Sequence, residues 1–196
     1  LITWESSYFV AITRAQSNMG CVYMGWVIPI LLLLLICILL YKYKWKSYDK
    51  LHLFVATAFC IYIFMTLSVT ILPLPFFYHI IGPLGLYFNL VPFVDLCEGS
   101  PYALQEIVLN VIMMMPLGFF VSYFSKKNRF VKVLLSAFLF SLTIETIQLI
   151  YGLFWTNLRS FDITDIITNT SGAALGALGF KLIDVVLTWT KKTHSS

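Results

Sequence analysis

The feature that most constrains this chain is the series of long apolar runs along its 196 residues. A helix needs about 20 apolar residues to cross the hydrocarbon core of a bilayer, which is about 30 Å thick. Five stretches approach or meet this requirement: 25–41, 53–72, 107–124, 133–151 and 163–182. Only 11% of the residues are charged, whereas soluble domains carry roughly a quarter. The sequence therefore predicts an all-α, polytopic transmembrane helix bundle with about five spanning helices.

These runs divide the chain into four predicted parts. Residues 1–23 are expected to be an extension that is not native or lies upstream of a start at Met19 or Met24. Residues 24–50 form the first membrane helix and a basic inner loop, 51–182 the main transmembrane domain, and 183–196 an interfacial or cytoplasmic tail. The four cysteines show no paired spacing, so neither a disulfide framework nor a metal site is predicted.

Lysine and arginine set the predicted orientation, because cytoplasmic loops of membrane proteins carry an excess of these residues. Four lie between the first and second predicted helices, and four lie between the third and fourth. Three more lie at or after the end of the fifth. That places eleven of the thirteen on one side, with Arg14 and Arg159 on the other. We expect a bacterial cytoplasmic membrane protein with its N-terminus outside and its C-terminus in the cytoplasm.

The outer loop between the second and third predicted helices, about residues 73–100, is apolar and aromatic and contains no Lys or Arg. Proline and glycine interrupt it too often for a spanning helix. We expect it either to lie at the outer interface, as an aromatic belt segment, or to dip into the membrane as a re-entrant segment covered by protein. The next helix is expected to start with Ser100 as its N-cap and Pro101 as its first residue.

Polar side chains fall in the outer halves of the last three predicted helices. Charged and polar groups within membrane spans usually face the bundle interior or water, and they often carry function. Glu145, for example, lies about 9 Å below the outer end of its helix at 1.5 Å per residue. Since the three helices place polar groups at one depth, we predict a single pocket open to the outside. In falling order of interest its residues are Glu145, Asp165, Arg159, Asn169, Asn110 and Gln148, followed by Asp162.

Most of these residues also have a purely structural explanation. Asp162 could act as the N-cap of the last helix. Asn110 and Gln148 could form hydrogen bonds between helices, and Arg159 could anchor the chain at the headgroups. Glu145 is the hardest to explain structurally, because a carboxylate inside a membrane helix needs a proton or a partner. Three glycines are expected to be close-packing positions between helices: Gly172, Gly176 and Gly179.

Four groups of residues carry a family resemblance. In chain order they are the segment 89–93 (NLVPF); Asn110 with Pro116, Gly118 and Phe119; Glu145 with Gln148; and Arg159, Phe161, Asp162, Asp165, Asn169, Gly172 and Gly176. Over about residues 50–180 this arrangement resembles the VanZ-like family. The resemblance implies an integral membrane protein. The family's named member is associated with resistance to the lipoglycopeptide antibiotic teicoplanin in Gram-positive bacteria, but the resemblance implies no particular reaction.

Four hypotheses for the function follow. In the first, the outer pocket recognises an amphipathic ligand, such as a lipid-linked cell-wall intermediate or a lipoglycopeptide, with membrane lipids around it and no nucleic acid involved. In the second, the protein is an intramembrane enzyme, with Glu145 and Asp165 as acid, base or metal ligands and Arg159 as an anion clamp. No cofactor is implied in either case, and Mg²⁺ would be the expected ion only for an enzyme.

The third hypothesis, a transporter, is disfavoured because the polar groups occupy one half of the membrane and the sequence contains no internal repeat. The fourth is a purely structural bundle in which Arg159 pairs with Asp162 or Asp165.

Overall fold

The structure, a computed structural model, describes residues 49–71, 88–127, 129–154 and 161–193. The predicted extension 1–23, the predicted span 25–41, residues 73–87 of the outer loop and Arg159 lie outside these residues. The chain divides into two compact units, Leu1–Ile81 and Gly82–Ser196. In the first unit the described element is α2 (Lys50–Thr70), whose N-cap Asp49 accepts a hydrogen bond from the His52 amide over 3.3 Å.

The described residues contain four helices that are long and apolar enough to cross a membrane. They are α2, α4 (Ala103–Phe124), α5 (Arg129–Phe154) and α6 (Ile163–Thr193). Many of their large apolar side chains are exposed, as is expected of helices whose outer solvent is lipid. The chain is therefore a multi-pass, all-helical membrane protein, as its composition predicts.

The observed helix ends differ from the predicted ones by several residues, and two of the differences correct specific predictions. The helix predicted to begin at Ser100 and Pro101 begins at Ala103 instead, with Tyr102 as its N-cap, so that prediction was wrong. Residues 100–102 form a turn, in which the Ser100 carbonyl accepts a hydrogen bond from the Ala103 amide. The last helix does not end at residue 182 but continues to Thr193, since no Gly or Pro interrupts residues 182–193.

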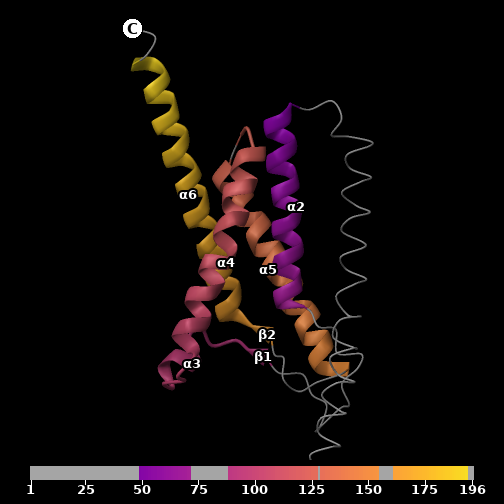
Figure 1. Ribbon diagram of the computed structural model, residues 1–196. Coiled ribbons are helices and arrows are strands. Elements are labelled where there is room, and N and C mark those ends of the chain that lie inside the picture. Colours follow the sequence, from indigo (N-terminus) through magenta and orange to yellow (C-terminus); the bar gives the residue numbers. More distant parts are fainter. Residues whose placement is uncertain (1–48, 72–87, 128, 155–160, 194–196) are drawn as a thin grey trace, which may run out of the picture. The chain divides into compact units, whose positions relative to one another are not determined.

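The second unit is built on α4, α5 and α6, with three short elements at one end (Figure 1). These are β1 (Phe88–Asn89), α3 (Val94–Cys97) and β2 (Phe161–Asp162). β1 and β2 pair in parallel, with Phe88 opposite Phe161 and Asn89 opposite Asp162. This pairing ties the described part of the outer loop to the start of α6, where the polar residues of the sequence are concentrated.

Small residues bring α4 and α6 into close backbone contact. A Cβ atom added at Gly172 would overlap the carbonyl of Val111, and one added at Gly176 would overlap the carbonyl of Met115. A Cβ atom added at Gly118 of α4 would likewise overlap the carbonyl of Ala173. The predicted close packing is thus present at Gly172 and Gly176, where a larger residue would push the two helices apart.

Gly179 shows no such close contact among the described residues, so helix packing there stays a prediction. A Cβ atom added there would meet no heavy atom within 4 Å among the described residues. The close backbone approach of α4 and α6 therefore ends before Gly179, side-chain contacts continue to Asp184, and the last turns of α6 project beyond α4 and α5 (Figure 1).

Candidate functional site

The polar residues at the β1–β2 end are joined through Asp162. Its Oδ2 accepts a hydrogen bond from Asn89 Nδ2 at 2.9 Å, and its Oδ1 accepts one from the Thr164 amide at 2.7 Å. The second contact is that of an N-cap residue, which satisfies one of the free amides at the start of α6. Asp162 therefore caps α6 and also holds β1 in place.

Glu145 reaches the same place from α5. Its Oε2 accepts a hydrogen bond from the backbone amide of Asp162 at 2.9 Å, and the residue is only 1% exposed. The carboxylate thus points into the bundle rather than towards lipid. A buried carboxylate with a backbone donor fixes the position of β2 relative to α5.

Asn110 and Asp165 join α4 to α6. Asn110 Nδ2 donates to Asp165 Oδ1 over 2.7 Å, and both residues are half-buried. One turn further into the bundle, Asn169 Nδ2 donates to Ser141 Oγ of α5 over 2.9 Å. Asn169 is 3% exposed, and its Oδ1 has no hydrogen-bond partner among the described residues. Polar groups of α4, α5 and α6 thus meet in two successive layers of the bundle.

Two predicted site residues are less closely tied to this arrangement. Arg159 lies outside the described residues. Gln148 follows Glu145 by one turn of α5 and is half-buried, but it does not line the cavity described next. The roles of all the candidate residues in ligand binding stay predictions.

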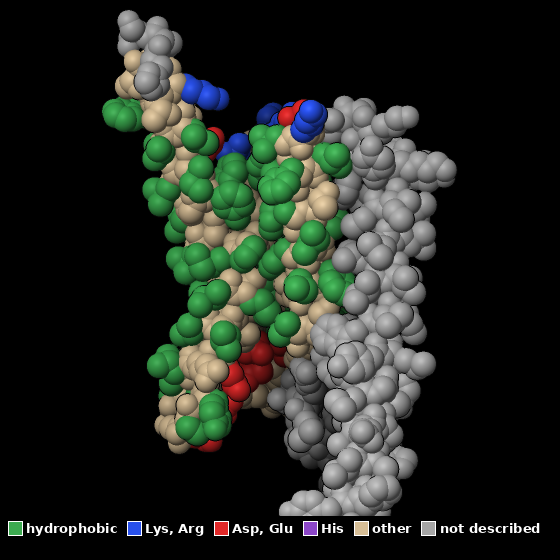
Figure 2. Space-filling model, viewed as in Figure 1, with side chains coloured by type: hydrophobic (Ala, Val, Ile, Leu, Met, Phe, Trp, Pro, Cys, Tyr) green, Lys and Arg blue, Asp and Glu red, His purple; other side chains and the backbone are tan. Residues whose placement is uncertain are grey.

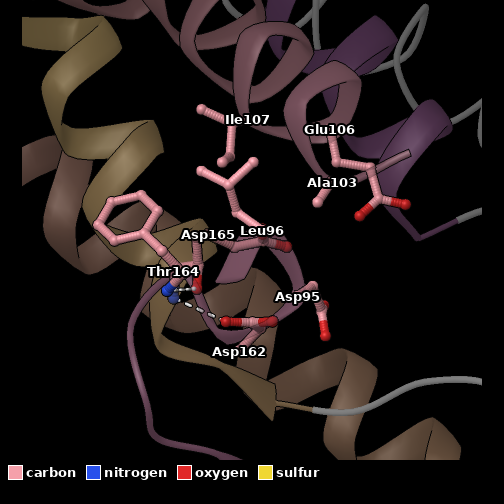
Figure 3. Close-up of a pocket in the computed structure, with 9 residues that line it drawn as sticks. Asp95, Leu96, Ala103, Glu106, Ile107, Asp162, Thr164 and Asp165 are labelled. Carbon is pink, nitrogen blue, oxygen red and sulfur yellow. Dashed lines mark hydrogen bonds between the residues drawn. The ribbon is translucent and has the colours of Figure 1, made fainter. Parts of the chain in front are cut away.

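A small cavity lies between α3, the start of α4 and the start of α6 (Figure 3). Its volume is about 20 Å³, which is room for a single water molecule. Four carboxylates line it: Asp95, Glu106, Asp162 and Asp165. Of the residues predicted from the sequence, only Asp162 and Asp165 border this space, whereas Glu145, Asn110 and Asn169 form the hydrogen-bonded layer beneath it.

Backbone geometry fixes the wall of the cavity next to β1. Phe93 adopts a left-handed conformation with φ 58°, which is uncommon for a residue other than glycine. Its amide donates to Thr164 Oγ1 over 3.0 Å. This bond anchors the segment before α3 to the first turn of α6 and so places Asp95 at the cavity.

The described charged side chains at this end are acidic. No Lys or Arg occurs among the described residues from 88 to 125 or from 133 to 180. Figure 2 shows a cluster of Asp and Glu side chains at this end, and the Lys and Arg side chains at the other, where Asp184 also lies. Within the described part of the chain, no group of three or more His, Cys, Asp or Glu residues is arranged to hold a metal ion. The carboxylates instead offer acceptors to hydroxyl, amide or ammonium groups.

Four residues of this site are not among the site residues predicted from the sequence: Asp95, Glu106, Phe93 and Thr164. Glu106 had a usable signal, because it precedes Asn110 by four residues and so lies on the same face of one helix. Asp95 had none, and Phe93 had only its place in the 89–93 motif, since both lie in a segment whose path depends on pairing with a strand 73 residues away.

Comparison with known proteins agrees with the arrangement of these motifs. The family model described as VanZ/LLP1 matches residues 59–184, which is more than half of the chain. The chain belongs to the VanZ/LLP1 family. The matched region includes α4, α5 and every residue of the polar arrangement from Asn89 to Asn169.

A curated member of this family gives a more specific, though partial, match. The chain is 37% identical over 94 residues to Protein VanZ of Enterococcus faecium. The alignment covers 48% of this chain and 50% of that protein, so the chain spans about half the length of this VanZ relative. No solved structure matches the chain at a significant level.

Proposed function

We propose that this VanZ-family chain is a five-span protein of the bacterial cytoplasmic membrane that recognises an amphipathic ligand at its outer surface. The ligand is a lipid-linked cell-wall intermediate or a lipoglycopeptide antibiotic, and its recognition confers protection of the teicoplanin type. The observation that carries the proposal is the proximity of a carboxylate-lined cavity and exposed apolar side chains at one end of the bundle.

The proposed orientation has the N-terminus outside and the C-terminus in the cytoplasm. Its support is the separation of charge in the second unit, where the basic residues lie at the α4–α5 turn and along the last part of α6. The positive-inside rule assigns that end to the cytoplasm. The carboxylates then lie at the outer leaflet, where cell-wall intermediates and externally added antibiotics are present.

The chemistry of the cavity favours one part of such ligands. Four carboxylates within one small space repel phosphate and attract ammonium or hydroxyl groups. The polar contact is therefore expected with amino, amide or sugar hydroxyl groups of the ligand. Its acyl chain has an apolar surface nearby, where Leu90, Val91 and Leu96 are between 45% and 63% exposed.

The size of the cavity limits how the ligand enters. A space of about 20 Å³ admits no sugar or peptide group. The ligand therefore binds across the mouth of the cavity or displaces the segment between β1 and α4. The second route requires breaking the Asn89–Asp162 and Phe93–Thr164 hydrogen bonds, both at the rim.

Recognition is favoured over catalysis by the placement of the two acidic residues proposed for chemistry. Asp165 borders the cavity, but Glu145 does not, and each has a carboxylate oxygen bonded within the protein. An acid and a base acting on one substrate must both reach its reacting atoms. The contacts of Glu145 and Asp165 instead hold the site together.

The proposal is tested by measuring glycopeptide susceptibility in a sensitive Gram-positive host that expresses the full chain. Asp95→Asn and Asp165→Asn remove charge at the cavity and are expected to reduce protection at unchanged protein level. Glu98→Gln is the matched control, because Glu98 is an exposed acid beside α3 that does not line the cavity. Full protection by the Asp95→Asn/Asp165→Asn double variant would contradict the proposal.

A further inference from the structure

At the end opposite the carboxylates, α6 projects beyond the turn that joins α4 to α5 (Figure 1). Its 31 residues span about 46 Å at 1.5 Å per residue. That length exceeds the hydrocarbon core and matches the roughly 40–45 Å of a bilayer with its headgroup layers. The last turns of α6 are therefore placed to cross one headgroup layer rather than to end at its edge.

An ion pair marks the level at which this projection begins. Arg129 Nη1, at the first residue of α5, lies 3.1 Å from Asp184 Oδ2. Arg129 is also held by the Ser125 carbonyl, which accepts from its Nε at 2.7 Å, and by the Phe180 ring, whose centroid is 5.3 Å from the guanidinium carbon. The α4–α5 turn is thus fixed against α6 at Asp184, and residues 185–193 extend past it.

An open recess of about 350 Å³ lies along this projecting part of α6. Its lining residues follow one face of the helix: Asp184, Val185, Thr188, Trp189 and Lys192. Trp189 is 67% exposed. Tryptophan favours the boundary between hydrocarbon and headgroups, so this exposure fits a position at that boundary. The recess therefore combines an apolar wall with a cation at its outer edge.

The residues around this recess are mostly basic. The described residues of the α4–α5 turn, the start of α5 and the end of α6 contribute Lys126, Lys127, Arg129, Lys132, Lys181, Lys191 and Lys192. The one acid among these segments is Asp184, and it is paired with Arg129. The Lys and Arg side chains gathered at this end are visible in Figure 2. The excess of basic residues around the recess favours an anionic ligand.

We propose that this recess binds an anionic phospholipid, with one acyl chain along Val185 and Trp189 and the phosphate at Lys192. A phospholipid fits both features, because its phosphate complements the lysines and its acyl chain complements the apolar wall. The site lies at the opposite end of the bundle from the proposed ligand site and does not depend on it. Arg129, held by Asp184, keeps the turn and its lysines beside the recess.

The test uses the full chain, purified in detergent and stripped of lipid, with the unfolding temperature measured as phosphatidylglycerol or phosphatidylcholine is added. Phosphatidylglycerol is expected to stabilise the protein at lower concentrations than phosphatidylcholine. Lys192→Gln is expected to raise the half-maximal phosphatidylglycerol concentration roughly fivefold, the effect of one lysine near a charged lipid surface.

Two controls separate a site from general attraction. Lys50→Gln removes an equally exposed charge at the start of α2 and is expected to leave the lipid response unchanged. Glycerol phosphate carries the headgroup without acyl chains and is expected to give no stabilisation. Equal half-maximal concentrations of the two phospholipids would overturn the proposal. So would a half-maximal phosphatidylglycerol concentration of Lys192→Gln equal to that of wild type or of Lys50→Gln, or stabilisation by glycerol phosphate alone.

Discussion

Asn110 of α4 donates a 2.7 Å hydrogen bond to the Asp165 carboxylate of α6, within the apolar length of both helices. Lipid offers no hydrogen-bond partner to either side chain, so the bond between them holds the two helices at a fixed register. The same pair places Asp165 at the edge of the carboxylate-lined cavity. Helix packing and the proposed site therefore share one contact.

Replacing Asn110 with Leu should destabilise the bundle by about 0.5–2 kcal/mol, because Asp165 loses a donor in a low-dielectric region. The free energy of unfolding is measured by titration with sodium dodecyl sulfate in mixed micelles. Leu109→Ala is the control, since Leu109 is 53% exposed and should change the free energy by less than about 0.5 kcal/mol. Equal effects of the two substitutions would show that the Asn110–Asp165 bond adds nothing.

Gly176 and Gly179 of α6 should respond differently to substitution by alanine. Gly176→Ala places a methyl group against the Met115 carbonyl and should destabilise the protein by about 1–3 kcal/mol. Gly179→Ala meets nothing within 4 Å among the described residues and should be neutral or stabilising by up to about 1 kcal/mol, through helix propensity. The same micelle titration measures both, and a Gly176→Ala variant as stable as wild type would argue against the close α4–α6 approach.

Asn169 and Ser141 should be energetically coupled. The variants Asn169→Ala and Ser141→Ala, together with their double variant, form a cycle whose coupling is expected at about 0.6–1.7 kcal/mol. The cycle is measured from unfolding free energies under one condition. Additive single effects would show that α5 and α6 are held by packing rather than by this bond.

Loss of the Asp162 side chain should loosen the segment from β1 to α3. Asp162→Ala removes the acceptors for Asn89 and for the Thr164 amide, and amide hydrogen exchange in residues 88–97 should rise by roughly tenfold or more. Exchange within the middle of α4 should not change, and Asp162→Asn, which keeps an acceptor oxygen, should have a smaller effect. Unchanged exchange in residues 88–97 would mean that other contacts hold this segment.

The membrane helices could be read from the sequence because they follow from local composition. Residues 53–72 and 133–151 are apolar enough to require a bilayer wherever they are placed. The shared depth of Glu145, Asn110 and Asp165 also followed from counting residues along each helix. Their hydrogen-bonded partners did not, because a helix position restricts depth and face but not which side chain lies opposite.

The sequence by itself determined the class of the protein, its family motifs and the positions of most helices, since these depend on hydrophobicity and on residues close in the chain. Tertiary structure alone decided that Asn89 and Phe93 fold back onto the start of α6, that Asp95 and Glu106 join Asp162 and Asp165 around one cavity, and that close packing ends before Gly179. Each of these depends on the meeting of segments tens of residues apart. Such contacts arise from the packing of whole helices, which no local pattern specifies.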